Sequence, residues 1–173
     1  MFIKRYVINP LLEIKKVEID QINQLYDFLN SLKDYHQLGL IKDEMSLIQL
    51  EKYILSAKKR WTDKNAFLFV IYLDNVICGL IKISIDKTNG RIEYLLKNED
   101  VEIIESVISF LIKVCKSTNL KWLYIVVDKS KAKLAKLLKT IGMYQLNAIE
   151  LKEINILKDE SDLLINNYWA KKV

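Results

Sequence analysis

Glu93 is the residue of this chain best placed for acid–base chemistry. It lies between Ile92 and Tyr94 in a short apolar run, so its carboxylate is expected to be half-buried in a strand. A carboxylate in such a place suits a general base, which removes a proton from a substrate group. The alternative is structural, with Glu93 as the ion-pair partner of Arg91 or of a neighbouring lysine.

An acidic segment follows this run. The chain reads Asn98-Glu99-Asp100-Val101-Glu102 and continues with a pattern of helical period. Carboxylates in the first turn of a helix interact favourably with its dipole, and the same charges repel a phosphate. A helix capped by its own acids is therefore the favoured interpretation. Backbone N–H groups can still bind a phosphate there if the side chains point away.

Lysines gather at the start of a later helix. Lys129, Lys131 and Lys133 crowd its first turn, where cations oppose the helix dipole and a bound anion would relieve the opposition. Lysine is frequent throughout this chain and also occurs at Lys136 and Lys139. An ordinary charged surface therefore explains the cluster equally well.

The remaining reactive side chains carry weaker signals. His36, the one histidine, lies beside Tyr35 in a predicted loop, where polar surface is its ordinary role. Cys78 and Cys115 fall in predicted core elements and lack the spacing of a zinc or disulfide motif. No metal centre is expected.

Hydrophobic periodicity predicts the elements that position these residues. Strands are expected near Phe2–Ile8, Ala66–Tyr72, Val76–Ile85, Arg91–Leu96, Leu123–Val127, Tyr144–Leu151 and Leu163–Trp169. Helices are expected around Ile22–Leu32, Ser46–Trp61, Asp100–Val114 and Leu134–Leu138. One strand–helix–strand crossover among several hairpins predicts an α/β fold with a mixed sheet and helices on both faces, as a single domain over residues 1–173.

Local motifs support these boundaries. Ser46 and Gln49 have the spacing of a capping box at a helix start. Asp74-Asn75 and Asn89-Gly90 are typical of tight turns between strands. Gly142 suits the left-handed position that follows a helix.

Composition narrows the function classes. The chain has 173 residues, 28% of them charged, and a net charge of +5 that comes almost entirely from lysine. Arginine, which favours bidentate recognition of bases and phosphates, occurs only at Arg5, Arg60 and Arg91, so no nucleic-acid partner is expected. No apolar run has the length of a membrane span, so we expect no membrane partner and a cytoplasmic protein.

Two stretches of the chain resemble a known family in motif and spacing. The first reads Ile77-Cys78-Gly79-Leu80-Ile81, then Ile85-Asp86, Asn89 and Ile92-Glu93-Tyr94. The second reads Asn119-Leu120-Lys121-Trp122, then Val127-Asp128 and Leu137-Leu138-Lys139-Thr140-Ile141-Gly142-Met143. Together they resemble the GNAT acetyltransferases, and within them the branch of ribosomal-protein N-terminal acetyltransferases.

The resemblance implies a GNAT-like fold and transfer of an acetyl group from acetyl-CoA to a primary amine, on a protein N-terminus or a small molecule. It implies cofactor contacts at Tyr94, Leu95, Leu96, Val101, Glu102, Ile103, Lys131 and Lys133. It also implies that Tyr35 and His36 border the acceptor. A homodimer is left open.

Departures from the family pattern leave the activity open. The family's phosphate loop has glycines where this chain has Glu99 and Val101, and its tyrosine near the end of the fourth helix falls on Leu138. Glu93 stands where the family has glycine, so its role as base is a local inference. Two alternatives to an active acetyltransferase therefore remain: a degenerate GNAT-fold interaction or regulatory module, and a protein that binds acyl-CoA without turnover.

Overall fold

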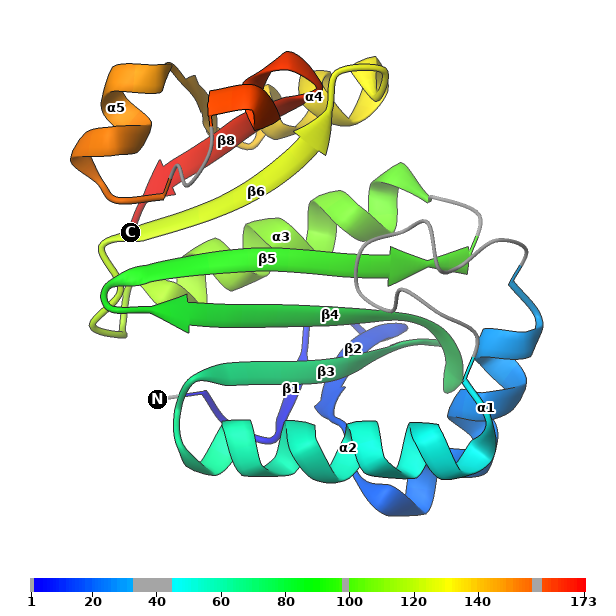
Figure 1. The fold of residues 1–173 in the computed structure, drawn as a ribbon. Helices are drawn as coiled ribbons and strands as arrows, with labels where there is room; N and C mark the ends of the chain where they lie inside the picture. Colours follow the sequence, from blue (N-terminus) through cyan, green and yellow to red (C-terminus); the bar gives the residue numbers. More distant parts are fainter. Residues whose placement is uncertain (1, 33–44, 98–99, 157–159) are drawn as a thin grey trace. The chain divides into compact units, whose positions relative to one another are not determined.

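Residues 2–32, 45–97, 100–156 and 160–173 are described by the computed structural model of the chain (Figure 1). They form two units, Met1–Ile85 with Glu93–Asp100 and Asp86–Ile92 with Val101–Val173. Strand β5 (Asn89–Leu96) belongs to both units: its residues up to Ile92 lie in the second unit, and those from Glu93 onward lie in the first unit. The prediction of a single domain stays a prediction.

The first unit is an antiparallel sheet with two helices. Neighbouring strands pair in the order β1 (Arg5–Val7), β2 (Leu12–Lys16), β3 (Ala66–Leu73) and β4 (Val76–Asp86). A 3-10 turn, η1 (Ile19–Gln21), leads into α1 (Ile22–Asn30), and α2 (Leu47–Thr62) follows and runs alongside β3 (Figure 1).

Apolar periodicity places both helices on one face of this sheet. Each helix buries a stripe at helical spacing, including Leu25 and Leu29 in α1 and Leu50 and Ile54 in α2. The stripes pack on Leu68, Val70, Tyr72, Leu80 and Leu95. Because side chains of a strand alternate between faces, residues two positions from Leu80 and Leu95 share this helix-covered face.

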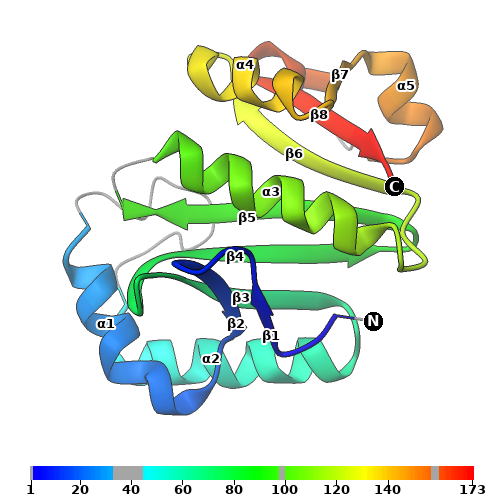
Figure 2. The ribbon, with the colours of Figure 1, turned by 180° about the vertical axis from the view of Figure 1, so that it is seen from behind.

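The second unit combines a mixed sheet with three helices (Figure 2). The start of β5 pairs in parallel with β6 (Trp122–Asp128), which pairs with β8 (Asn166–Lys172), and β8 pairs with β7 (Tyr144–Leu146). The helices are α3 (Val101–Cys115), α4 (Ala132–Thr140) and α5 (Ala148–Glu153), and a 3-10 turn, η4 (Glu160–Leu164), precedes β8. The crossover β5–α3–β6 accounts for the parallel pair.

The structure confirms the predicted α/β class and several local motifs. Ser46 caps α2 and exchanges hydrogen bonds with Gln49 in a capping box. Asp74 and Asn75 both adopt positive φ, 49° and 63°, as a tight hairpin turn requires. Gly142 follows α4 with φ 79°, the left-handed conformation that favours glycine.

Three strand predictions need correction. Strand β2 was missed, because its charged residues Glu13, Lys15 and Lys16 hide the apolar pattern of a strand that lies between β1 and β3. The predicted strand Tyr144–Leu151 ends at Leu146, because the Asn147 side chain accepts hydrogen bonds from the N–H groups that start α5. The last strand is Asn166–Lys172 and not Leu163–Trp169.

The predicted turn at Asn89-Gly90 also lies elsewhere. The turn is formed by Lys87, whose φ is 54°, and Thr88. Asn89 and Gly90 are already in β5, and the Asn89 side-chain amide donates to the carbonyl of Ile154 at 2.7 Å. Within the described ranges, no helix is long and apolar enough to cross a membrane.

Candidate functional site

Glu93 forms an ion pair on the helix-covered face of the first unit. Its Oε2 lies 2.5 Å from Nζ of Lys82, and the two side chains are only 17% and 16% exposed. The hydroxyl of Ser84 donates to the same oxygen at 3.4 Å. Lys82 and Ser84 lie two and four positions after Leu80 along β4, so strand alternation brings them to one face.

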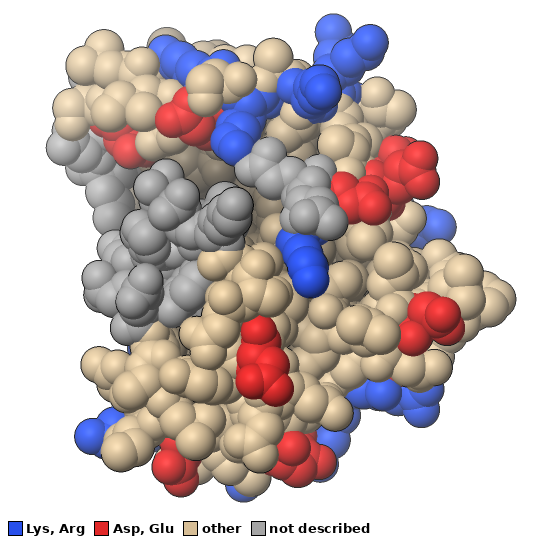
Figure 3. All heavy atoms as spheres, turned by 90° about the vertical axis from the view of Figure 1, so that its right-hand side faces the viewer, with Lys and Arg blue, Asp and Glu red and all other residues tan. Residues whose placement is uncertain are grey.

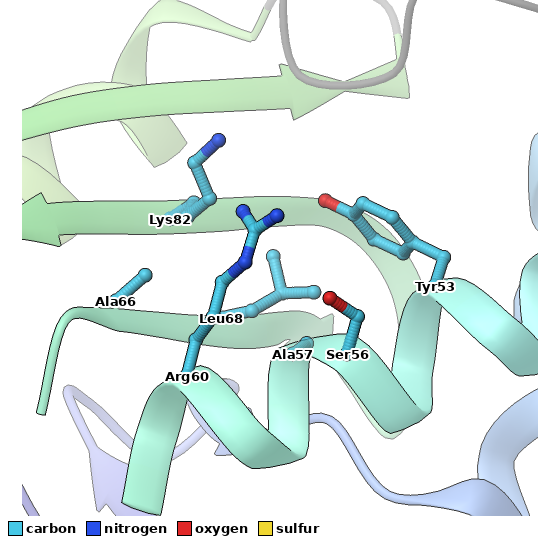
Figure 4. A pocket seen from close by; sticks show the side chains of 7 residues that line it. All are labelled: Tyr53, Ser56, Ala57, Arg60, Ala66, Leu68 and Lys82. Atoms are coloured by element: carbon cyan, nitrogen blue, oxygen red, sulfur yellow. The ribbon is translucent and has the colours of Figure 1, made fainter. Parts of the chain in front are cut away.

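A hollow opens beside this ion pair. It is lined by Tyr53, Ser56, Ala57 and Arg60 of α2, Ala66 and Leu68 of β3, and Lys82 of β4. Its empty volume is about 260 Å³, which includes space open to solvent. Figure 4 shows the Tyr53 hydroxyl and the Arg60 guanidinium pointing toward each other above Leu68, with Lys82 beyond them.

Helical spacing positions the α2 side of the hollow. Tyr53, Ala57 and Arg60 follow one another at four and three residues, so they lie along one flank of the helix. The small side chains of Ser56 and Ala57 leave room between Tyr53 and Arg60. The neighbouring buried stripe fixes the helix on the sheet and thereby fixes this flank.

Electrostatics keep the Tyr53 hydroxyl protonated. Burial, together with the charge of Glu93 and against the opposite effect of Arg60, raises the pKa of Tyr53 to about 12. A phenol with this pKa donates hydrogen bonds at neutral pH and does not carry a negative charge. The influence of both Glu93 and Arg60 on Tyr53 places all three groups in one electrostatic environment.

The two thiols are unsuited to nucleophilic catalysis. Burial raises the pKa of Cys78 to about 11 and that of Cys115 to about 12. Since the thiolate is the reactive form, neither thiol is activated at neutral pH. The prediction that both cysteines are core residues holds fully for Cys115, which is buried, and in part for Cys78, which is partly exposed.

The predicted contacts on the second half of β5 have mixed exposure. Tyr94 is partly exposed, whereas Leu95 and Leu96 are buried. Leu95 packs in the core beneath α1 and α2, so only its backbone is available to a ligand. A Cβ at Gly79 would lie 2.6 Å from the Leu95 carbonyl oxygen, which explains the glycine in β4.

Two helix starts in the second unit carry the other predicted cofactor residues. Helix α3 begins at Val101, with Val101 and Glu102 exposed and Ile103 buried. Helix α4 begins after Lys131, and Lys131 and Lys133 are both exposed.

The start of α4 has a basic surface. Lys131 occupies the N-cap position and its side chain makes no capping hydrogen bond. Lys129, Lys131 and Lys133 are exposed there, and Figure 3 shows Lys and Arg side chains gathered along the upper edge of that view. Hydrogen bonds from Ser130, first from its side-chain hydroxyl and then from its backbone N–H at 2.8 Å, lower the pKa of Asp128.

The predicted parallel pairing of the strands that contain Tyr94 and Val126 is confirmed in their first halves. The register joins Asn89 to Trp122 and ends at the pair of Ile92 and Ile125. The predicted splay beyond this pair involves residues of both units and stays a prediction.

Sequence reasoning found Glu93 but missed its surroundings. A neighbouring lysine, Lys82, is an ion-pair partner of Glu93, as one of the two interpretations expected; the role of Glu93 as base stays a prediction. Tyr53 and Arg60 were missed, although their shared helical flank was visible in the spacing. The predicted acceptor residues Tyr35 and His36, and Glu99 of the acidic segment, lie outside the described residues. The described part of the chain contains no cluster of three metal-ligating side chains.

Solved structures of acetyltransferases have a similar fold. No family model matches the chain, and no curated protein matches its sequence. The chain is similar to the microcin C7 self-immunity acetyltransferase MccE in complex with acetyl-CoA and AMP, with a TM-score of 0.78, 16% identity, and coverage of 96% of this chain and 94% of that one.

Two ribosomal-protein acetyltransferases have a similar structure. RimL, the ribosomal L7/L12 alpha-N-protein acetyltransferase, in complex with coenzyme A has a TM-score of 0.75 and 11% identity, with 98% of each chain covered. The ribosomal-protein-S5-alanine acetyltransferase of Vibrio fischeri has a TM-score of 0.73 and 16% identity, with 97% of this chain and 96% of that one covered. The chain therefore has the GNAT fold over nearly its whole length, as its motifs predicted.

Proposed function

We propose that this protein is an N-acetyltransferase that uses acetyl-CoA and acetylates a primary amine. The observation that carries the proposal is the half-buried carboxylate of Glu93, held by Lys82 beside a hollow that opens to solvent. A GNAT fold supports the class of reaction, and fold alone does not establish chemistry. The site residues carry the rest of the argument.

Glu93 is proposed as the proton acceptor. A primary amine is largely protonated at neutral pH, and its nitrogen becomes a nucleophile only after it loses a proton. Lys82 and Ser84 hold the Glu93 carboxylate in one orientation on β5. Tyr53, protonated at neutral pH, can donate a hydrogen bond to a group bound in the hollow but cannot take the proton.

The second unit offers a set of donors that suits the phosphates of acetyl-CoA. The exposed ammonium groups of Lys131 and Lys133 lie at the N-terminal turn of α4, where the helix dipole also favours an anion. The backbone N–H groups of Val101–Ile103 lie at the N-terminus of α3, where the helix dipole favours an anion for the same reason. When bound, acetyl-CoA supplies the activated acetyl thioester. In two of the similar structures the bound molecule is acetyl-CoA or coenzyme A.

A degenerate interaction module is the second candidate. The exposed carboxylate of Glu102 in the first turn of α3 favours it, because this charge satisfies the helix dipole and repels a phosphate. The lysines of α4 favour the first candidate, because a bound anion would offset their opposition to the helix dipole. Cofactor binding therefore separates the two candidates.

Thermal unfolding with and without nucleotide tests the proposal. A ligand that binds only the native state stabilises it by about 2.7 kcal/mol at a concentration of 100 times Kd, which raises Tm by several degrees. We expect acetyl-CoA and CoA to raise Tm, and AMP at equal concentration to raise it less. No shift with acetyl-CoA at millimolar concentration would favour the interaction module.

A further inference from the structure

We infer that the hollow between α2, β3 and β4 binds a carboxylate carried by the acceptor, so that the substrate is an amine that also bears a carboxylate group. This inference rests on the proposed acetyltransferase function and names the class of its substrate.

Every polar group that lines the hollow can donate a hydrogen bond. Arg60 and Lys82 are cations, and Tyr53 and Ser56 carry hydroxyl groups. Figure 4 shows the guanidinium of Arg60 and the phenol of Tyr53 directed toward each other, whereas the ammonium of Lys82 points away from them toward the next strand. The remaining lining residues, Ala57, Ala66 and Leu68, are apolar. A group of donors favours an anionic guest, because a hydrogen bond to an ionised group is stronger than one between neutral groups.

The charge balance favours a monoanion. The ammonium of Lys82 is matched by the carboxylate of Glu93 at 2.5 Å. Arg60 is exposed, and the ion pairs among the described residues do not include it. Among the described residues that line the hollow or pair with its lining, Arg60 therefore carries the positive charge that no carboxylate matches. A planar guanidinium matches a carboxylate in geometry through two parallel hydrogen bonds.

The same charges orient the acceptor. Arg60 attracts the substrate carboxylate and repels its ammonium, which directs the amine toward the side of the hollow where Glu93 and Lys82 form a pair that is neutral as a whole. An amine without a carboxylate would leave Arg60 without a counter-charge and would lack this orientation. The arrangement therefore discriminates between a carboxylate and the uncharged carboxamide of the same shape.

Matched acceptors test the inference. The first acceptors are pairs of peptides with N-terminal serine that carry either Asp or Asn at the second, third or fourth position. Glycine and glycinamide form a further pair. The assay measures kcat/KM for each acceptor with acetyl-CoA. We expect the wild type to prefer the carboxylate about tenfold in at least one pair. Arg60→Gln should abolish this preference, so that acid and amide have about equal kcat/KM. Arg60→Lys should keep part of the wild-type preference. Lys59→Gln, an exposed neutralisation one residue away on α2, should keep it.

The outcomes separate this inference from the proposed function. Equal acetylation of every acid and amide by the wild type would overturn the carboxylate site and leave the acetyltransferase in place. If no amine is acetylated, the proposed function fails, and a binding experiment then tests the carboxylate site by itself. N-acetylglycine should shift the ring signals of Tyr53 in NMR spectra, and N-acetylglycinamide should not. An absence of this shift, or its persistence in Arg60→Gln, would contradict the site.

Discussion

Lys82 and Glu93 form an ion pair between β4 and β5, with Nζ and Oε2 2.5 Å apart and both side chains largely withdrawn from solvent. Such a pair offsets the desolvation of each charge only while both partners are present. Its position beside the hollow therefore has consequences for stability as well as for chemistry.

Removal of one partner should destabilise the fold more than removal of both. Lys82→Met leaves the Glu93 carboxylate without its cation, and we expect a loss of about 1–3 kcal/mol in the free energy of unfolding. Glu93→Gln should have a smaller effect of the same sign, because the amide can still accept a hydrogen bond. Urea unfolding of both single variants and the double variant measures the coupling; additive losses would mean that the ion pair is energetically unimportant.

Glu93→Gln should slow the reaction without weakening cofactor binding. A positioned general base contributes about 10²–10⁴-fold to a rate, so kcat should fall by at least about 10²-fold. The Kd of acetyl-CoA from calorimetry should stay within about twofold. Glu51→Gln removes an exposed carboxylate on α2 and is the control. Full activity of Glu93→Gln at every pH would remove Glu93 from the mechanism.

Tyr53 should make the protein sensitive to alkali. Its pKa is raised to about 12 in the folded protein, whereas the unfolded chain ionises near the ordinary value of 10.0. The stabilising contribution is therefore complete below pH 10 and is lost as pH rises toward 12. Tyr53→Phe should reduce the loss of unfolding free energy between pH 9 and pH 11 by about 1 kcal/mol. Identical pH dependence of the two proteins would show that Tyr53 ionises normally.

The lysines of α4 should contribute to cofactor affinity. Replacing Lys131 and Lys133 with glutamine should stabilise the free protein slightly, because cations oppose the dipole at a helix start. The same change should weaken CoA binding by no more than about 1 kcal/mol per lysine, and less at high salt. Glutamine at Lys116 and Lys121, two exposed lysines outside α4, is the matched control. Equal affinities at low salt would make the α4 lysines ordinary surface.

Much of the fold can be predicted from the sequence, because the local sequence signals agree with the observed structure. The apolar stripes of α1, α2 and α3, the turn at Asp74-Asn75 and the glycine at Gly142 each determine local structure. Strand β2 was missed because a strand between two others can carry charged residues whose pairing is not local. Glu13, for example, is bound by Arg5 of the neighbouring strand β1.

The candidate site was legible only in part. Glu93 stood out as a carboxylate among apolar residues of one strand. Its neighbours Tyr53 and Arg60 lie on a helix some thirty residues or more earlier in the chain, and only the tertiary packing of α2 on the sheet brings them close. Periodicity assigns residues to a face of an element, but it does not state which faces meet.

Acetyl transfer itself tests the central claim most directly. The purified protein is incubated with acetyl-CoA and the carboxylate-bearing peptides, and mass spectrometry locates the acetyl group, with Glu93→Gln assayed in parallel. The account predicts acetylation of the peptide α-amine by the wild type and at least about 10²-fold slower acetylation by the variant. No acetylated amine above the uncatalysed background, in a protein whose Tm acetyl-CoA does not change, would contradict it.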